Sequence, residues 1–158
     1  MPTQDFTAQA RQIYEEVLNK GELDVADDLV AKNCVGHSGS EEIRGPEGFK
    51  QFAQGFRTAF PDLRFTIQEI VAQGNTVVTR YTSQGTQRGP LQGIAPTGKT
   101  ATLTGISIGH FGPDGKLSEW FLNFDELGLL RQLGVVPAGM PATMPMGMAA
   151  QPQEQPHG

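Results

Sequence analysis

The first third of the chain repeats hydrophobic residues at helical spacing. Apolar side chains recur three and four positions apart from Phe6 to Leu18, and Gly21 ends the run. This pattern predicts a helix over residues 4–20, because such spacing places the apolar side chains on one face. A shorter pattern of the same kind predicts a second helix over residues 23–30.

An aromatic stripe predicts a third helix over residues 46–60. Pro46 suits the first turn of a helix, and Pro61 stops the pattern. The apolar residues between them share one face and comprise Phe49, Phe52, Ala53, Phe56 and Phe60. So large an apolar face requires a large partner, and the second half of the chain supplies one.

Four segments rich in β-branched and apolar residues follow the predicted helices. They span residues 63–73, 76–86, 99–111 and 116–125. Turn signals at residues 74–75 and 112–115 predict antiparallel hairpins, and residues 87–98 predict a longer loop. Glu69 interrupts the alternation of its segment, which predicts a bulge that bends the sheet.

The order of these elements predicts an α+β fold. We expect a curved antiparallel sheet with the three N-terminal helices packed on its concave face, so that sheet and helices enclose a cone. We assign residues 1–136 to this domain. Residues 137–158 hold five of the 11 prolines and one charged residue, Glu154, so we predict a disordered tail.

Composition and charge limit the function classes. The 158 residues suit one domain, and the net charge of −5 lacks the basic field that binds phosphate backbones, so we expect no nucleic-acid partner. No apolar stretch approaches a membrane span, and the first residues carry no signal-peptide pattern. We therefore expect no membrane partner and a cytoplasmic location. The single cysteine, Cys34, is predicted to be a buried apolar residue.

The last two predicted strands carry isolated polar residues among apolar ones. Alternation places four residues on one face, namely Glu119, Phe121, Asn123 and Asp125. If Phe111 pairs with Lys116, this face continues across the hairpin through Thr104, Ile106, Ile108 and His110. The opposite face carries Trp120, Leu122 and Phe124. Since both faces are apolar and one layer of helices covers only one of them, we expect a second subunit on the face with Trp120, in a homodimer.

Asp125 has two interpretations that the sequence leaves open. It precedes a helical run that begins at Glu126, and Asp is a favoured helix N-cap. Alternatively, burial in an apolar pocket would raise the pKa of the carboxylate and make it a general base. His37 and His110 each have two interpretations as well, as a residue of the core or rim or as a residue that binds a ligand.

Several segments together resemble a known family. They are IRGPEGFKQF (residues 43–52), AFPDLR (59–64), GIAPTGK (93–99) and DELGLLRQLG (125–134). In these segments the chain is similar to the SnoaL-like polyketide cyclases, or ester cyclases, which belong to the superfamily of nuclear transport factor 2 and ketosteroid isomerase. The resemblance covers residues 6–134 and implies the cone-shaped fold.

The resemblance also implies a chemistry. Characterised members close a ring by intramolecular aldol condensation, without metal or cofactor, and use an aspartate as acid and base. By resemblance that residue is Asp125, with His37 facing the same pocket. The expected ligand is a small apolar or aromatic carbonyl compound. The side chains expected to bind it are His110, Asn123, Phe121, Phe49, Phe52, Phe56, Ile106 and Ile108.

The chain departs from the family pattern at two places. Many members carry a His-Trp pair ahead of the aspartate, whereas Trp120 and Phe121 stand at those positions here. Gln87 also stands where a histidine is frequent. Two alternatives to a cyclase therefore remain. One is a binding protein without turnover, and the other is an isomerase or a hydrolase in which Glu119 and Arg80 assist Asp125.

Overall fold

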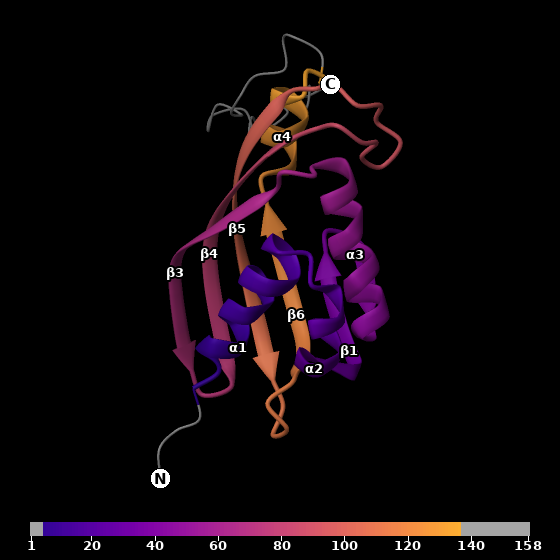
Figure 1. Cartoon of the computed structure of the whole chain (residues 1–158). Helices are drawn as coiled ribbons and strands as arrows, with labels where there is room; N and C mark the ends of the chain where they lie inside the picture. Colours follow the sequence, from indigo (N-terminus) through magenta and orange to yellow (C-terminus); the bar gives the residue numbers. More distant parts are fainter. Residues whose placement is uncertain (1–4, 137–158) are drawn as a thin grey trace, which may run out of the picture.

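A curved six-stranded sheet forms one layer of the molecule (Figure 1). The computed structural model describes residues 5–136, so the predicted tail lies outside the described residues. The strands are β1 (Val30–Ser38), β2 (Glu41–Arg44), β3 (Arg64–Gln73), β4 (Thr76–Thr86), β5 (Thr100–Phe111) and β6 (Leu117–Phe124). Their order across the sheet is β2-β1-β6-β5-β4-β3, and every neighbouring pair is antiparallel except β1 and β6.

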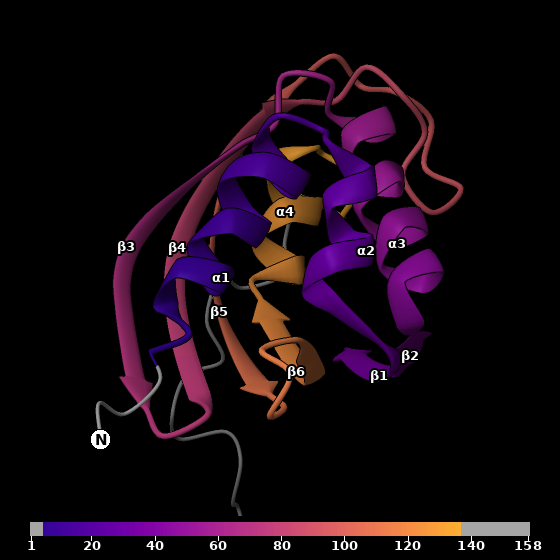
Figure 2. The ribbon, with the colours of Figure 1, turned by 60° about the horizontal axis from the view of Figure 1, so that its bottom comes forward.

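The helical segments form the second layer. They are α1 (Thr7–Gln12), the π-helical η1 (Ile13–Asn19), the 3-10 turn η2 (Leu23–Val25), α2 (Ala26–Leu29), α3 (Gly45–Ala59) and α4 (Glu126–Gln132). Figures 1 and 2 show α1, α2 and α3 on the concave side of the sheet, with α4 near one end. The predicted α+β fold is confirmed, as is the placement of three N-terminal helical segments on the concave face.

The sequence did not predict β1 and β2. Residues 30–38 show no clear alternation of apolar and polar side chains, β2 is only four residues long, and the other partner of β1 lies far along the chain, at β6. The pairing is parallel, with Val35 opposite Glu119 and His37 opposite Phe121. A local sequence pattern does not indicate pairing with a distant strand, whereas the turn signals at residues 74–75 and 112–115 indicated the β3–β4 and β5–β6 hairpins.

The β5–β6 hairpin differs from its predicted register by two residues. Phe111 pairs with Leu117 rather than Lys116, and a bulge shifts the register so that His110 faces Glu119. Because side chains alternate with period two, this shift leaves the predicted grouping on each face intact. The bulge predicted at Glu69 is confirmed, since the β3–β4 register shifts between Ile67 and Glu69.

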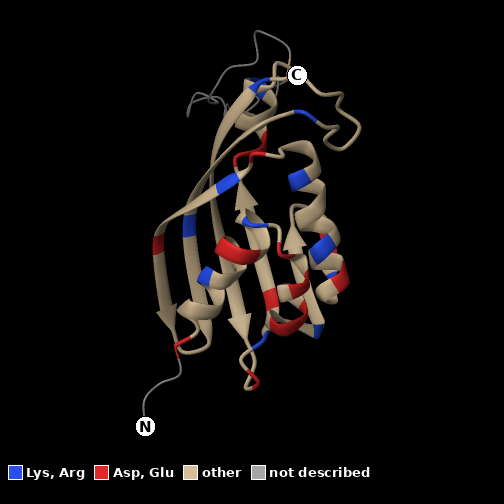
Figure 3. Cartoon of the chain, in the orientation of Figure 1, with Lys and Arg blue, Asp and Glu red and all other residues tan. Residues whose placement is uncertain are grey.

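The core lies between the helices and the concave face. Its fully buried side chains include Val17, Val30, Cys34, Val77 and Phe111, so the prediction for Cys34 is confirmed. Charged residues lie mainly on the helices and loops, with a few along the strands (Figure 3), and β5 carries none. Among the described residues, no helix is long and apolar enough to span a membrane.

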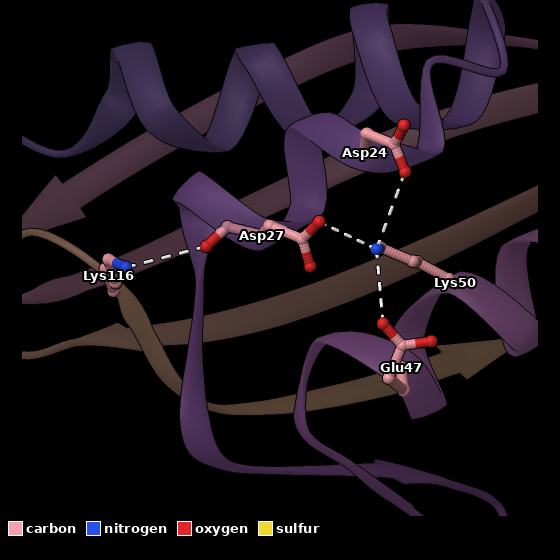
Figure 4. Close-up of polar contacts among 5 residues, drawn as sticks. All are labelled: Asp24, Asp27, Glu47, Lys50 and Lys116. Atoms are coloured by element: carbon pink, nitrogen blue, oxygen red, sulfur yellow. Dashed lines mark hydrogen bonds and ion pairs between the residues drawn. The ribbon is translucent and has the colours of Figure 1, made fainter.

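Lys50 connects α3 with the helical segments before β1 (Figure 4). Its Nζ atom lies 2.8 Å from Asp27 Oδ2, 3.2 Å from Glu47 Oε1 and 3.6 Å from Asp24 Oδ1. The hydrogen bond to Asp27, the largest cause, holds the pKa of Lys50 above its usual range. Lys116, in the β5–β6 turn, reaches the Asp27 carbonyl oxygen at 3.5 Å. These contacts join α3, which carries the aromatic stripe, to the segments before β1 at the surface.

Gln87 organises the loop between β4 and β5 although its side chain is fully buried. Its amide nitrogen donates to the carbonyl oxygens of Ile94 and Ala95, at 3.4 and 3.3 Å. Its amide oxygen accepts from the backbone and the hydroxyl of Thr97, at 3.2 and 2.8 Å. Backbone bonds to residues 98 and 99 close the loop at its base. One side chain thus satisfies the inward-facing polar groups of the loop.

Candidate functional site

The first of two cavities between the helices and the sheet is lined mainly by aromatic side chains. We call it the aromatic cavity, and its aromatic walls are Tyr14, Phe52, Phe56, Phe60, Phe65, Tyr81 and Phe124. Its volume is about 70 Å³. Several of these rings meet edge to face, such as Phe52 with Phe56, whose centroids are 5.1 Å apart. An apolar, ring-lined space of this kind suits a flat apolar ligand.

The second cavity lies beside the first and also measures about 70 Å³. We call it the tryptophan cavity, because Trp120 lines it together with Phe49, Val77, Ile108, Phe111 and Leu117. Four residues border both cavities, namely Tyr14, Leu18, Phe52 and Leu122. Each volume is far below the roughly 300 Å³ at which ligand pockets begin. A ligand larger than a few atoms therefore has to displace these dividing side chains.

The dividing side chains come partly from a π-helical segment. Tyr14 and Leu18 both lie in η1, where the backbone departs from α-helical geometry. Such π-helical turns are rare and often occur at functional sites. The helical segment that separates the aromatic cavity from the tryptophan cavity thus has π-helical rather than α-helical backbone geometry.

The polar side-chain groups of the cavity walls are hydroxyls and the indole N–H of Trp120. The hydroxyls of Tyr14 and Ser107 share a hydrogen bond of 2.6 Å, and burial raises the pKa of Tyr14 to about 12 despite it. Tyr81 is 3% exposed, and burial, with Tyr14 close by, holds its pKa above the usual range. Both phenols therefore stay protonated at neutral pH. No Asp, Glu, His, Lys or Arg among the described residues lines either cavity.

The sequence-based assignment of the sheet faces was wrong about which face the helices cover. Trp120 and Leu122 line the tryptophan cavity, and Phe124 lines the aromatic cavity, so the chain's own helices cover this face. The face expected to hold the site is instead the outer one. It exposes Ile106 and Phe121, which are 48% and 38% accessible. The face that remains for a second subunit is thus the one with Phe121, whereas the sequence led us to expect the one with Trp120.

The two histidines expected at the site lie with Phe121 on the outer face. The His37 ring stacks on Phe121, with centroids 4.6 Å apart, and its Nε2 atom lies 3.1 Å from Glu119 Oε2. His110 meets Phe121 edge to face at 6.2 Å, and its Nδ1 atom lies 3.1 Å from the Thr76 hydroxyl. The structure therefore brings His37 and His110 together around one ring, but across the sheet from both inner cavities.

Asp125 caps α4 and borders an open hollow on the outer face. Its Oδ1 atom accepts the Gly128 N–H at 2.9 Å, and the residue is exposed, as the N-cap interpretation expects. The outer hollow, as we call it, has a volume of about 540 Å³. Its walls include Arg80, Ile106, Ile108, Phe121, Asn123 and Asp125.

The hydrolase alternative requires Asp125, Glu119 and Arg80 to lie together, and the structure brings only two of them together. Arg80 borders the outer hollow with Asp125, but its Nε atom donates to Glu69 at 3.0 Å. Glu119 pairs with His37 instead of joining them. Among the described residues, no group of three or more His, Cys, Asp or Glu side chains is arranged to hold a metal ion.

The expected site residues thus divide between two places. Phe49, Phe52 and Phe56 of α3 line the inner cavities, and Ile108 borders both the tryptophan cavity and the outer hollow. The sequence patterns did not indicate the hydroxyl residues of the cavities, namely Tyr14, Thr79, Tyr81, Ser83 and Ser107. Tyr14 stood within a helical apolar stripe and Tyr81 within a strand, so their patterns identified core positions without indicating a cavity.

Comparison with known proteins identifies the family. The SnoaL-like polyketide cyclase family profile matches residues 8–133, which is most of the chain. The chain belongs to this family. No curated protein sequence matches it. The family assignment and the six-stranded cone agree with the nuclear transport factor 2-like fold expected from the sequence motifs.

Several solved structures share the fold. A candidate SnoaL-like polyketide cyclase from Jannaschia sp. CCS1 superposes with a TM-score of 0.77 at 18% identity, covering 84% of this chain and 93% of its own. TsrD from Streptomyces laurentii gives a TM-score of 0.73 at 28% identity, covering 82% and 97%. IdmH from Streptomyces antibioticus, named a candidate polyketide cyclase, gives 0.69 at 28% identity, covering 84% and 100%.

Proposed function

We propose that this SnoaL-like protein is a small-molecule enzyme of the polyketide cyclase type, which closes a ring in an apolar carbonyl substrate. The observation that carries the proposal is the pair of adjoining cavities, walled by aromatic rings and buried hydroxyls, in a chain that matches the cyclase family over residues 8–133. Apolar walls exclude water and stack on flat rings, and a few donors orient the carbonyl groups.

The proposed reaction is an intramolecular aldol-type ring closure that needs no cofactor. A proton leaves the carbon between two carbonyl groups, and the resulting enolate carbon bonds to a further carbonyl carbon. That carbonyl oxygen becomes an alkoxide and takes up a proton, so the atoms balance. The protonated phenol of Tyr81 would stabilise negative charge on oxygen, since a well-placed donor can lower a barrier by about 3 kcal/mol.

Asp125 is the proposed proton carrier, on the strength of the family resemblance. It is adjacent to Phe124, which lines the aromatic cavity, and one helical turn before Leu129, which lines the same cavity. Its carboxylate accepts the Gly128 N–H and faces outward, so the proposed step requires the carboxylate to leave this cap. The proposal gives no step to His37, His110 or Asn123, because they lie on the outer face.

One observation favours a second candidate function, binding without turnover. The described residues that line the two inner cavities include no carboxylate and no imidazole, so they offer no side chain that takes a proton from carbon at neutral pH. A protein with such walls would hold an apolar carbonyl compound without changing it.

A substitution at Asp125 separates the two candidates. Asn also caps helices, so Asp125→Asn should keep stability within about 1 kcal/mol of wild type. If Asp125 carries the proton, turnover of a naphthyl 1,3-dicarbonyl ester that also bears a ketone on its ring, as the carbonyl that the enolate attacks, should fall by a factor of about 10² to 10⁴. Asp62 is a matched control, because its carboxylate also accepts a backbone N–H, from Thr86 at 2.7 Å. Asp62→Asn should leave turnover unchanged.

The outcomes decide between the candidates. Unchanged turnover by Asp125→Asn would refute the role of the carboxylate. A wild-type protein that binds the ester but never converts it would instead establish the binding function. The assay should follow loss of the open-chain ester by mass spectrometry as well as absorbance, since ring closure followed by loss of water changes both.

A further inference from the structure

Tyr81 places an unpartnered hydroxyl in the aromatic cavity. The residue is 3% exposed and lines that cavity, and among the described residues its hydroxyl has no hydrogen-bond partner. Tyr14, on the facing helical layer, differs in this respect because its hydroxyl bonds Ser107 at 2.6 Å. Among the described residues, Gln9 Oε1 is the only fully enclosed side-chain polar atom without a partner, so the unpaired Tyr81 oxygen faces space that a ligand atom can reach.

The sheet is built to accept the Tyr81 ring. Tyr81 on β4 pairs with Gly105 on β5, and the ring lies across this glycine. A Cβ atom at Gly105 would overlap the phenol oxygen and would lie 2.9 Å from Cε1. Only glycine therefore leaves room for the ring to lie flat and extend its hydroxyl from β4 across β5. Phe124, which pairs with Gly105 on β6, lines the same cavity on that side.

Neighbouring rings hold Tyr81 in this orientation. Its centroid is 5.1 Å from that of Phe65 and 5.5 Å from that of Tyr14. Burial holds the pKa of Tyr81 above its usual range, so the hydroxyl remains protonated at neutral pH. The cavity therefore presents a hydrogen-bond donor, surrounded by apolar walls, to whatever enters it.

We propose that the Tyr81 hydroxyl is the ligand-orienting donor of the aromatic cavity, and that it binds the carbonyl oxygen of an aromatic ketone whose ring displaces the dividing side chain of Phe52 and lies against Phe56 and Phe124. This inference rests on the proposed function for the class of substrate, but it concerns binding and not the proton-transfer step. It assigns Gly105 the role of making space for the donor. The Tyr14–Ser107 pair marks the point at which a longer ligand would pass into the tryptophan cavity.

Two probes of nearly equal shape test the proposal, acetophenone and ethylbenzene, which differ in one carbonyl oxygen. In calorimetric titrations, Tyr81→Phe should weaken acetophenone binding by about 2- to 10-fold, the usual range for one hydrogen bond, and leave ethylbenzene binding unchanged. Tyr14→Phe is the matched control, because Tyr14 is the other of the two tyrosines and already has a partner. It should change the acetophenone preference less than Tyr81→Phe does.

A measurement on the wild-type protein covers the case in which a variant fails to fold. The carbonyl stretching band of ¹³C-labelled acetophenone should move to lower wavenumber on binding, relative to the band in hexane. An unshifted band, equal losses for both probes in Tyr81→Phe, or no acetophenone binding would each overturn the inference. None of these readouts depends on turnover. The inference can therefore hold where the cyclase proposal fails, and the reverse.

Discussion

The contact between Gly36 and Trp120 offers a sharp test of how β1 joins the sheet. Gly36 pairs with Trp120 across the parallel β1–β6 junction. A Cβ atom at Gly36 would overlap the indole ring and lie 2.5 Å from its Nε1 atom. The ring cannot retreat easily, because it is 6% exposed and meets Phe49 and Phe52 at centroid distances of 5.7 and 5.4 Å. Gly36→Ala should therefore destabilise the fold.

The expected size follows from two opposing effects. Overpacking of a buried site costs about 1 to 3 kcal/mol, because side chains leave their preferred rotamers. Replacing Gly by Ala returns about 0.4 to 1 kcal/mol, because the unfolded chain loses freedom. The net loss in the free energy of unfolding is about 1 to 2 kcal/mol. In a domain of this size that lowers the melting temperature by about 3 to 10 °C.

Thermal unfolding followed by circular dichroism measures this loss against two comparisons. Gly55 lies exposed in α3, and a Cβ atom there meets nothing within 4 Å, so Gly55→Ala should raise the melting temperature. In a Trp120→Leu background the clash is gone, and Gly36→Ala should cost little or even stabilise. An equal loss in both backgrounds, or a stable Gly36→Ala protein, would refute the packing described for this junction.

Two further predictions concern the outer face and Tyr14. The exposed Ile106 and Phe121 lead us to expect a homodimer through the outer face, so light scattering should give twice 17.0 kDa for wild type and 17.0 kDa for Ile106→Glu. A wild-type monomer would contradict this. Because burial raises the pKa of Tyr14 from 10.0 to about 12, Tyr14 favours folding below pH 10, and that contribution is lost as the pH rises toward 12. The melting temperature should therefore fall less steeply over this interval in Tyr14→Phe, and parallel pH profiles would show that Tyr14 does not contribute.

Local patterns predicted most of the fold. The aromatic stripe of α3, the two hairpins and the bulge at Glu69 depend on residues close together in the chain, so spacing alone located them. The sequence did not predict β1, because its residues do not alternate, its neighbouring partner β2 is short, and its other partner β6 lies more than 80 residues away in the parallel pairing of Val35 with Glu119. The π-helical turn of η1 also left no sequence signal, since its residues fit an ordinary helical stripe.

The candidate site was harder to predict because both faces of the β5–β6 hairpin are apolar. Alternation separates Phe121 and Ile106 from Trp120 and Leu122 correctly, but it does not say which set faces the helices. The polar residues drew the prediction to the outer face, where Asp125 and His37 lie. The inner face instead uses Tyr14 and Tyr81, which count as core residues in any hydrophobicity pattern until a cavity is seen beside them.

Because the buried amide of Gln87 shapes the β4–β5 loop from inside, the outward-facing residues of the loop can be substituted with little effect on its backbone. The shape of the loop is imposed from inside, by one side chain that binds Ile94, Ala95 and Thr97, and from its base, where Gln87 and Lys99 bond through the backbone. Outward-facing residues of the loop are free of that task. Substitutions there should leave the loop in place, whereas a change at Gln87 would remove its side-chain hydrogen bonds and leave the loop held by the backbone bonds of Arg88 and Gly89 to Ala59 and by buried Leu91.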